Sequence, residues 1–158
     1  MELKEKIKSV ILAPLETEED RMIGIELEDF VYDMKGARIP VNPGSEYSAS
    51  DLLNNLIDFQ VNDKYKAYYS IEPGGQIEWA STPQRSLHDL QIELNNHQKR
   101  LNHLLTNYQL ETIDLAVEPI YLPNEIDFID HKKYKLMHEL LIRTGKHGPW
   151  MMRNTTSI

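Results

Sequence analysis

The sequence contains no cysteine, and this absence excludes a disulfide framework, a thiol nucleophile and a thiolate metal site. It also has little positive charge, since 17 Lys and Arg stand against 25 Asp and Glu, for a net charge of −8. We therefore expect neither nucleic acid nor an anionic membrane surface as the main partner. No apolar run approaches the length of a membrane span, and the first residues lack the apolar core of a signal peptide. A cytoplasmic location is the expectation.

The length and the hydrophobic content fit a single domain, because 158 residues with 41% hydrophobic side chains can form a real core. The chain stops inside a strand-like run, Thr155-Thr156-Ser157-Ile158, with no glycine, proline or polar tail to close it. Natural domains usually end in a mobile surface segment. We therefore expect residues 1–158 to be one truncated domain, a fragment of a longer protein.

The most informative stretch is a predicted hairpin over residues 69–79. A Pro-Gly-Gly turn divides it, since proline presets the first turn position and glycine adopts the positive backbone angles that other residues resist. Side chains alternate along a strand, so Glu72, Gln76 and Glu78 share one surface in a plausible register. Ile77 and Trp79 point to the opposite surface. A fold rarely gathers like charge in this way without a compensating cation.

Helices are predicted over residues 2–12, 51–60, 86–108 and 132–143, where apolar side chains recur at three- and four-residue steps. Ser50 with Asp51 and Ser86 with Asp89 are the expected starts of the second and third helices. Pro14 is expected to end the first. The third helix presents one broad apolar face that can cover a sheet. Its members are Leu87, Leu90, Leu94, His97, Leu101, Leu104, Leu105 and Tyr108.

Strands are predicted outside the hairpin over residues 22–32, 112–118 and 151–158, with a further short strand ending at Pro40 after a turn at Asp33 to Gly36. The predicted inward positions of the strand over 112–118 are Ile113, Leu115 and Val117. On the strand over 151–158, Arg153, Thr155 and Ser157 share one face. Strands and helices in this order favour an α+β fold, an antiparallel or mixed sheet with helices packed on one face.

Two pairs of glutamates are the candidate chemistry of the chain. Glu26 and Glu28 lie two residues apart on one strand, and Glu72 and Glu78 share a face across the hairpin. If the strands are neighbours, four carboxylates meet on one patch, which suits Mg²⁺ or Mn²⁺ together with the phosphates of ATP. The alternative is the solvated face of an antiparallel sheet, because any half-exposed strand alternates polar and apolar residues.

Both glutamate segments resemble signature strands of the glutamate–cysteine ligase family of the plant and proteobacterial type, within the glutamine-synthetase-like carboxylate–amine ligases. The residues that carry the resemblance are Gly24-Ile25-Glu26-Leu27-Glu28 and Ser70-Ile71-Glu72-Pro73-Gly74-Gly75-Gln76-Ile77-Glu78. Ser81-Thr82-Pro83, the Leu-rich helix, Tyr134-Lys135-Leu136-Met137 and the run from Met151 to Ile158 follow in the family's order. The similarity covers about residue 22 to the end, and its Glu-Pro-Gly-Gly-Gln-hydrophobic-Glu run is specific.

The resemblance implies an ATP-dependent ligase that phosphorylates the γ-carboxylate of glutamate and lets the amine of cysteine displace phosphate, the first step of glutathione synthesis. It also implies part of a metal-lined antiparallel sheet of the glutamine-synthetase-like type. Glu26, Glu28, Glu72 and Glu78 would then be ligands of Mg²⁺ or Mn²⁺. Arg153 would be catalytic, holding a substrate carboxylate or the transferring phosphoryl group.

Gln76 would hydrogen-bond substrate in this family, although filling the hairpin face explains the residue equally well. This chain has Thr155-Thr156 where the family usually has a cysteine, and residues 125–149 match poorly, which leaves the acceptor amine open. The family's catalytic domain continues past residue 158, so the chain alone is expected to be inactive. A non-catalytic interaction or regulatory module that kept the fold is the alternative, and an exposed sheet edge would favour its self-association.

The remaining candidates are weaker. The histidines show no paired metal spacing such as His-Glu-x-x-His. His97 falls on the apolar stripe of the long helix, which favours a packed core residue over a ligand. No Lys-Ser or Lys-Thr follows Gly74-Gly75, so this is no phosphate-binding loop of the nucleotide-binding type.

Overall fold

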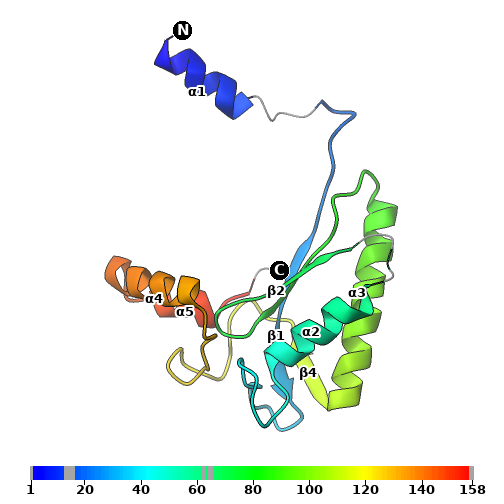
Figure 1. Cartoon of the computed structure of the whole chain (residues 1–158), viewed down its shortest axis with the longest axis vertical. Helices are drawn as coiled ribbons and strands as arrows, with labels where there is room; N and C mark the ends of the chain where they lie inside the picture. Colours follow the sequence, from blue (N-terminus) through cyan, green and yellow to red (C-terminus); the bar gives the residue numbers. More distant parts are fainter. Residues whose placement is uncertain (1, 13–16, 62, 64–65, 157–158) are drawn as a thin grey trace.

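The structure is a computed structural model that describes residues 2–12, 17–61, 63 and 66–156. Its helices are α1 (Leu3–Leu12), α2 (Ala49–Phe59), α3 (Leu87–Tyr108), α4 (Lys132–Thr144) and α5 (Gly148–Arg153). Its strands are β1 (Glu26–Asp33), β2 (Tyr68–Ile71), β3 (Ile77–Ala80) and β4 (Leu110–Ile113). They form one open antiparallel sheet in the order β2-β3-β1-β4, which confirms the α+β prediction (Figure 1).

One face of the sheet is covered by α2 and α3, and the hydrophobic core lies between them. The side chains of the core are almost completely buried, and they include Val31, Leu52, Leu56, Tyr69, Ile77, Trp79, Leu101, Leu104 and Leu105. α4 and α5 pack against each other and lie on the other side of the sheet from α3 (Figure 1). The apolar face predicted for the long helix is confirmed over its middle, whereas Leu87 in the first turn and Tyr108 at the end are exposed.

Side-chain caps explain where the two central helices begin. Ser86 is the N-cap of α3, as predicted, and its hydroxyl accepts hydrogen bonds from the backbone of His88 and Asp89. α2 begins two residues before the predicted start, because Ser48 rather than Ser50 is its N-cap. Asp51 closes a capping box with Ser48, whereas the hydroxyl of Ser50 donates to the carbonyl of Val41 instead.

The predicted hairpin is confirmed, with β2 and β3 joined by a tight turn. The backbone N–H of Gly75 donates to the carbonyl of Glu72, and Gly75 has a φ of +83°, in the region that favours glycine. Gly74 is required for a different reason, since a Cβ atom there would lie 2.7 Å from the Cα of Arg153. The turn therefore packs backbone against backbone on the end of α5.

Three strand predictions are wrong in part. No strand ends at Pro40, because after the turn at Asp33 to Gly36 only one bridge forms, between Tyr32 and Arg38. β4 ends at Ile113, and Leu115 and Val117 are about half exposed rather than inward. The strand over 151–158 begins as the helix α5, since Pro149 in its first turn presets helical backbone. Thr155 makes a single bridge to Val117, and Ser157 lies outside the described residues.

α1 stands apart from the rest of the chain, and all of its residues are exposed (Figure 1). Its predicted bounds are confirmed, while Pro14, its predicted stop, lies outside the described residues. Among the described residues, none of the helices combines the length and the apolar character that crossing a bilayer needs.

Candidate functional site

The acidic face of the sheet, defined by Glu28, Glu72 and Glu78, lies opposite the core. β1 and β3 are neighbours, and Glu28 pairs directly with Glu78 across them. Glu78 in turn pairs with Ser70 of β2, whose hydroxyl donates to the carboxylate of Glu78 at 2.9 Å. Like charges directly opposite each other in an antiparallel sheet are destabilising. The fold therefore places two like charges directly opposite each other on this face.

Glu72 joins this pair from the end of β2. Its pKa is raised, first by burial and then by the negative charges of Glu78 and Glu28. The charges of Glu28 and Glu78 both act on Glu72, so the three carboxylates lie near one another. The sequence analysis predicted that these residues from two strands would meet, and the strand register brings them together.

Glu26 lies at the margin of the acidic face. Strand alternation places it on the same side as Glu28, but its cross-strand partner is Ala80 and its side chain is exposed. It is not among the charges that raise the pKa of Glu72. The structure thus brings three of the four predicted glutamates into one group and leaves Glu26 two residue pairs further along the strands.

The donor chemistry of the acidic face fits a hard divalent cation, because Mg²⁺ and Mn²⁺ prefer carboxylate oxygens. Within the described part of the chain, no three Asp, Glu, His or Cys side chains are arranged closely enough to hold a metal ion. Binding a cation here therefore requires Glu28, Glu72 and Glu78 to rotate toward a common point. The pKa of Glu72 is raised first by burial and then by the charges of Glu78 and Glu28, and a bound cation would relieve this repulsion.

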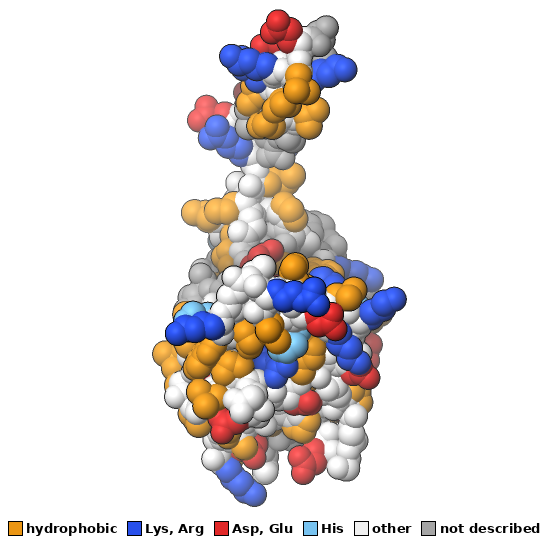
Figure 2. Space-filling view, turned by 90° about the vertical axis from the view of Figure 1, so that its left-hand side faces the viewer, with side chains coloured by type: hydrophobic (Ala, Val, Ile, Leu, Met, Phe, Trp, Pro, Cys, Tyr) orange, Lys and Arg blue, Asp and Glu red, His pale blue; other side chains and the backbone are white. Residues whose placement is uncertain are grey.

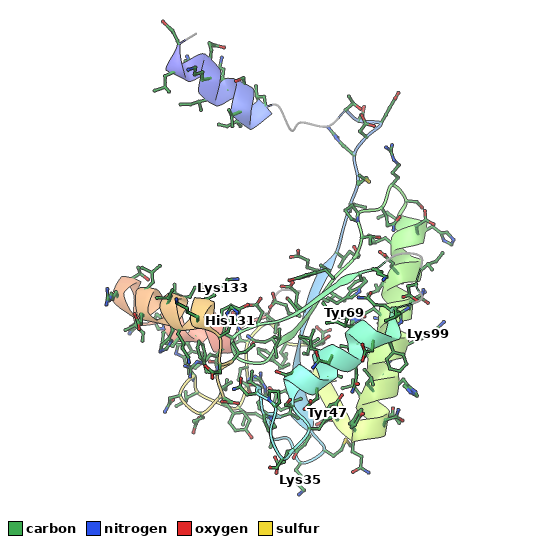
Figure 3. All side chains as sticks on the ribbon, viewed as in Figure 1. Lys35, Tyr47, Tyr69, Lys99, His131 and Lys133 are labelled. Carbon is green, nitrogen blue, oxygen red and sulfur yellow. The ribbon has the colours of Figure 1, made fainter. Side chains whose placement is uncertain are left out.

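The first turn of α4 brings two residues to the acidic face that the sequence analysis did not assign. The positive charge of Lys133 lowers the pKa of Glu72. The pKa of Tyr134 is raised, first by burial and then by Glu72 and Glu78, and its hydroxyl donates to the carbonyl of Ile71 at 3.4 Å. Figure 3 labels Lys133 beside His131 at this end of α4. Tyr134 opens a segment that resembles the family, but the sequence analysis placed neither residue beside the glutamates, and only the folded chain reveals this position.

A buried polar network holds the hairpin turn from the other side. The guanidinium of Arg38 donates to the carbonyl of Gly74 at 2.6 Å and to the carboxylate of Glu118 at 2.7 Å. The hydroxyl of Tyr32 donates to the same carboxylate at 2.6 Å. Arg38 also lies over the ring of Phe30, with 4.7 Å to the centroid. The half of β1 beyond the glutamates is therefore covered on both faces, and the acidic face is confined to the other half.

Gln76 is almost completely buried, at 1% exposure. Its Nε2 donates to the carbonyl of Thr155 at 2.8 Å, which ties the hairpin to the segment after α5. Its Oε1 is buried without a hydrogen-bond partner among the described residues. One end of this side chain is thus structural, and the other end has an unused acceptor.

Arg153 lies at the end of α5, with its backbone against Gly74 and its guanidinium on the far side of the loop before α4. Nη1 donates to the carbonyl of Pro123 at 2.7 Å, and the guanidinium lies 4.4 Å from the ring centroid of Phe128. Burial lowers its pKa, partly offset by the nearby charge of Asp127. These contacts lie on the loop before α4, and within the described part of the chain no hydrogen bond or ion pair joins the Arg153 side chain to the acidic face.

His97 is a core residue, as predicted. Its ring stacks on Trp79 with 4.6 Å between centroids, and its Nδ1 is hydrogen-bonded to the hydroxyl of Tyr69 at 3.0 Å. Burial lowers its pKa to about 4, so the ring is neutral at pH 7. This histidine is not part of the site.

The sequence model of Glutamate-cysteine ligase family 2 matches residues 22–158. The matched range includes both glutamate pairs, Gln76 and Arg153, and leaves out α1. The resemblance that the glutamate motifs indicated is therefore shown over most of the chain.

Curated relatives are similar over almost the whole chain at low identity. Glutamate–cysteine ligase B, chloroplastic, of Oryza sativa subsp. japonica is 23% identical over 98% of this chain and 33% of the relative. Glutamate–cysteine ligase, chloroplastic, of Medicago truncatula is 23% identical over 98% of the chain and 32% of the relative. The protein of the same name from Arabidopsis thaliana is 22% identical, with 31% of its length covered. The chain spans about a third of the length of these relatives.

Proposed function

The chain belongs to Glutamate-cysteine ligase family 2, and from this premise we propose that it supplies one wall of the active site of an ATP-dependent carboxylate–amine ligase. In the proposed reaction the γ-carboxylate of glutamate is phosphorylated by ATP, and the amine of cysteine then displaces phosphate. The observation that carries the proposal is the direct pairing of Glu28 with Glu78, on the face that also holds Glu72. A purely structural sheet gains nothing from this arrangement.

The proposed role of the acidic face is to hold Mg²⁺ or Mn²⁺. Glu28, Glu72 and Glu78 are the proposed principal ligands, with Glu26 at the margin. A divalent ion held there would bind the phosphates of ATP and neutralise their negative charge. Lys133 stands beside the glutamates and is placed to meet an anionic substrate group on the same face.

Two further side chains are proposed to bind substrate. Arg153 holds a carboxylate or the transferring phosphoryl group, because a guanidinium presents paired donors to paired oxygens. Gln76 offers its buried and unpartnered Oε1, while its Nε2 stays on Thr155. These roles come from the family resemblance, and the buried Gln76 and half-buried Arg153 are compatible with them.

We further propose that residues 1–158 are inactive alone, since the chain covers about a third of its relatives. The expected result is no phosphate release from ATP when glutamate, cysteine and Mg²⁺ are supplied together. Release that depends on both amino acids would contradict this proposal. A cytoplasmic location stays a prediction beside it.

The second candidate function, a non-catalytic interaction module, is favoured by the open edges of the sheet. β2 and β4 are its outer strands, and β1 pairs with β4 only from Phe30 onward. Exposed strand edges invite pairing with another chain. Sedimentation velocity at increasing concentration separates a monomer from such self-association.

The metal site is tested directly by thermal unfolding with Mn²⁺ or Mg²⁺ added. A cation that binds only the folded state stabilises it by about 2.7 kcal/mol at one hundred times its dissociation constant. We expect wild type and the control Glu111→Gln, an exposed glutamate of β4, to respond alike. We expect Glu78→Gln to lose most of the response. An equal response in Glu78→Gln, or none in wild type, would contradict the proposed site.

A further inference from the structure

A pocket of about 330 Å³ lies between α4, α5 and the loop that contains Pro123 and Asn124. None of the glutamates of the acidic face lines it. The side chains that matter for its chemistry come from separate segments: His138 from α4, Lys146 from the connection to α5, and Trp150 and Arg153 from α5.

The pocket is basic in a chain that is acidic overall. No Asp or Glu lines it, whereas Lys146 and Arg153 both do. Residues 131–153 carry six Lys and Arg and one glutamate, although the net charge of the whole chain is −8. Figure 2, which faces the α4 and α5 side, shows Lys, Arg and His side chains gathered around apolar ones. The local charge therefore favours an anion.

Two nitrogen atoms of the pocket residues are buried without partners. These are Nε of Arg153 and Nδ1 of His138, and neither has a hydrogen bond among the described residues. The ring of Phe128 contacts both groups, with 4.4 Å to the guanidinium of Arg153 and 5.5 Å to the ring of His138. A buried polar group without a partner is costly, so most such groups have a hydrogen-bond partner. An arginine Nε can only donate, which means that the missing partner is an acceptor.

The nearest carboxylate is already occupied. Asp127 acts on Arg153 electrostatically, but its Oδ2 accepts hydrogen bonds from the backbone N–H of Val41 at 3.1 Å and from the side chain of Asn42. Its Oδ1 accepts from the backbone of Phe128 at 2.8 Å. Asp127 therefore does not supply the acceptor that the buried nitrogens lack.

We propose that this pocket binds the carboxylate or phosphate group of a small anionic molecule. Arg153 and His138 donate to its oxygens, Lys146 adds positive charge from an exposed position, and Trp150 packs against its uncharged part. The inference deepens the substrate-binding role proposed for Arg153, and it rests on the proposed function only for the identity of the substrate. His138 and Lys146 line the same pocket as Arg153, and no sequence motif assigns either of them to a binding site.

The experiment is an NMR titration of the full chain with inorganic phosphate and, separately, with acetate, each against sodium chloride of equal ionic strength. We expect the indole signal of Trp150 and the ring signals of His138 to shift with at least one of the two anions and not with chloride. A response to phosphate assigns the pocket to a phosphate group, and a response to acetate assigns it to a carboxylate. No response to either anion beyond that to chloride would overturn the proposal.

Variants separate the pocket from general charge effects. Lys146→Gln is expected to weaken anion binding about two- to five-fold, as loss of one exposed charge contact does. Its matched control is Lys99→Gln, which removes an exposed lysine of α3 far from the pocket (Figure 3) and should leave affinity unchanged. Arg153→Gln should weaken binding more than ten-fold. Equal weakening by both lysine variants would overturn the site even if Arg153→Gln fails to fold.

The metal titration keeps the two proposals apart. Glu78→Gln should lose the Mn²⁺ response and bind the anion as wild type does, while Lys146→Gln should keep the Mn²⁺ response and bind the anion more weakly. Anion binding without any Mn²⁺ response in wild type removes the proposed metal site and leaves the pocket standing. A Mn²⁺ response without anion binding removes the pocket alone.

Discussion

Neighbouring residues of β3 enter two opposite environments. Trp79 is 1% exposed and packs on His97 beneath α3, whereas Glu78 faces away from the core toward two other carboxylates. Each face holds one titratable group, His97 on the core face and Glu72 on the acidic face, and burial disfavours the charged form of both. The core face satisfies its group with stacking and a hydrogen bond. The acidic face instead places the negative charges of Glu28 and Glu78 near Glu72, and this difference is the reason why we propose it as the functional side.

The largest expected effect comes from substituting the two neighbours in turn. Trp79→Ala should lower the free energy of unfolding by about 3–5 kcal/mol, because it opens a cavity beneath α3. Glu78→Ala, the adjacent change on the other face, should alter the free energy of unfolding by less than about 1 kcal/mol. The variant loses both the repulsion with Glu28 and the hydrogen bond from Ser70, and these two losses have opposite signs. Urea unfolding of both variants measures the contrast. Similar losses in the two variants would mean that the two faces do not differ as described.

The pH dependence of His97 sharpens the comparison. Its pKa is about 4 in the folded chain against 6.5 ordinarily, so the unfolded chain binds the proton first as pH falls. Stability is therefore fully present above pH 6.5 and declines toward pH 4, by about 2–3 kcal/mol at most. His97→Phe should remove this decline, at a cost of about 1–3 kcal/mol at pH 7 for the unpaired hydroxyl of Tyr69.

Urea unfolding at several pH values between 4 and 7 gives this slope. The matched control is His88→Gln, an exposed histidine of the same helix, which should keep the wild-type slope. If His97→Phe keeps that slope as well, another group is responsible for it.

The smallest expected effect concerns Glu72, whose contribution to stability changes with pH in the opposite direction to that of His97. Its pKa is raised in the folded chain, so the folded state binds the proton more strongly than the unfolded state. Its contribution to stability therefore falls as pH rises from its ordinary pKa of 4.5 through the raised value. Glu72→Gln should stabilise the metal-free protein at pH 7, by less than about 1 kcal/mol.

Thermal unfolding without metal measures this gain, with Glu46→Gln, an exposed loop change, as the neutral control. The gain should turn into a loss when Mn²⁺ is present, since the variant removes a proposed ligand. A destabilised Glu72→Gln variant in the absence of metal would show that the charge of Glu72 is compensated within the chain.

Short-range chemistry explains which predictions were confirmed. The hydroxyl of Ser86 bonds backbone groups no more than three residues further along the chain. The Pro-Gly-Gly turn likewise depends only on the backbone angles of its own residues. The failures occurred where two local solutions compete. Ser48 and Ser50 can each cap a helix, and the partner available to each hydroxyl decided between them. The run after Met151 has strand-like residues, but Pro149 sets helical backbone first.

The candidate site divides in the same way. Alternation along β1 and across the hairpin is a property of the sequence, and it was enough to give Glu28, Glu72 and Glu78 a common side. Their pairing required the register of β1 on β3. The contributions of Lys133 and Tyr134 required α4 to fold back over the hairpin.

Caps, turns and periodicity specify the helices, the hairpin and the orientation of the glutamates, because these forces act over a few residues and leave a pattern in the chain. The buried ion pair of Arg38 with Glu118 joins residues 80 positions apart, and the basic pocket of His138, Lys146 and Arg153 joins separate segments. Such contacts leave no periodic pattern, since burial and distance create them only after the chain has closed on itself. The proposed metal site could thus be predicted from residue order, whereas the proposed anion pocket could be found only in the folded molecule.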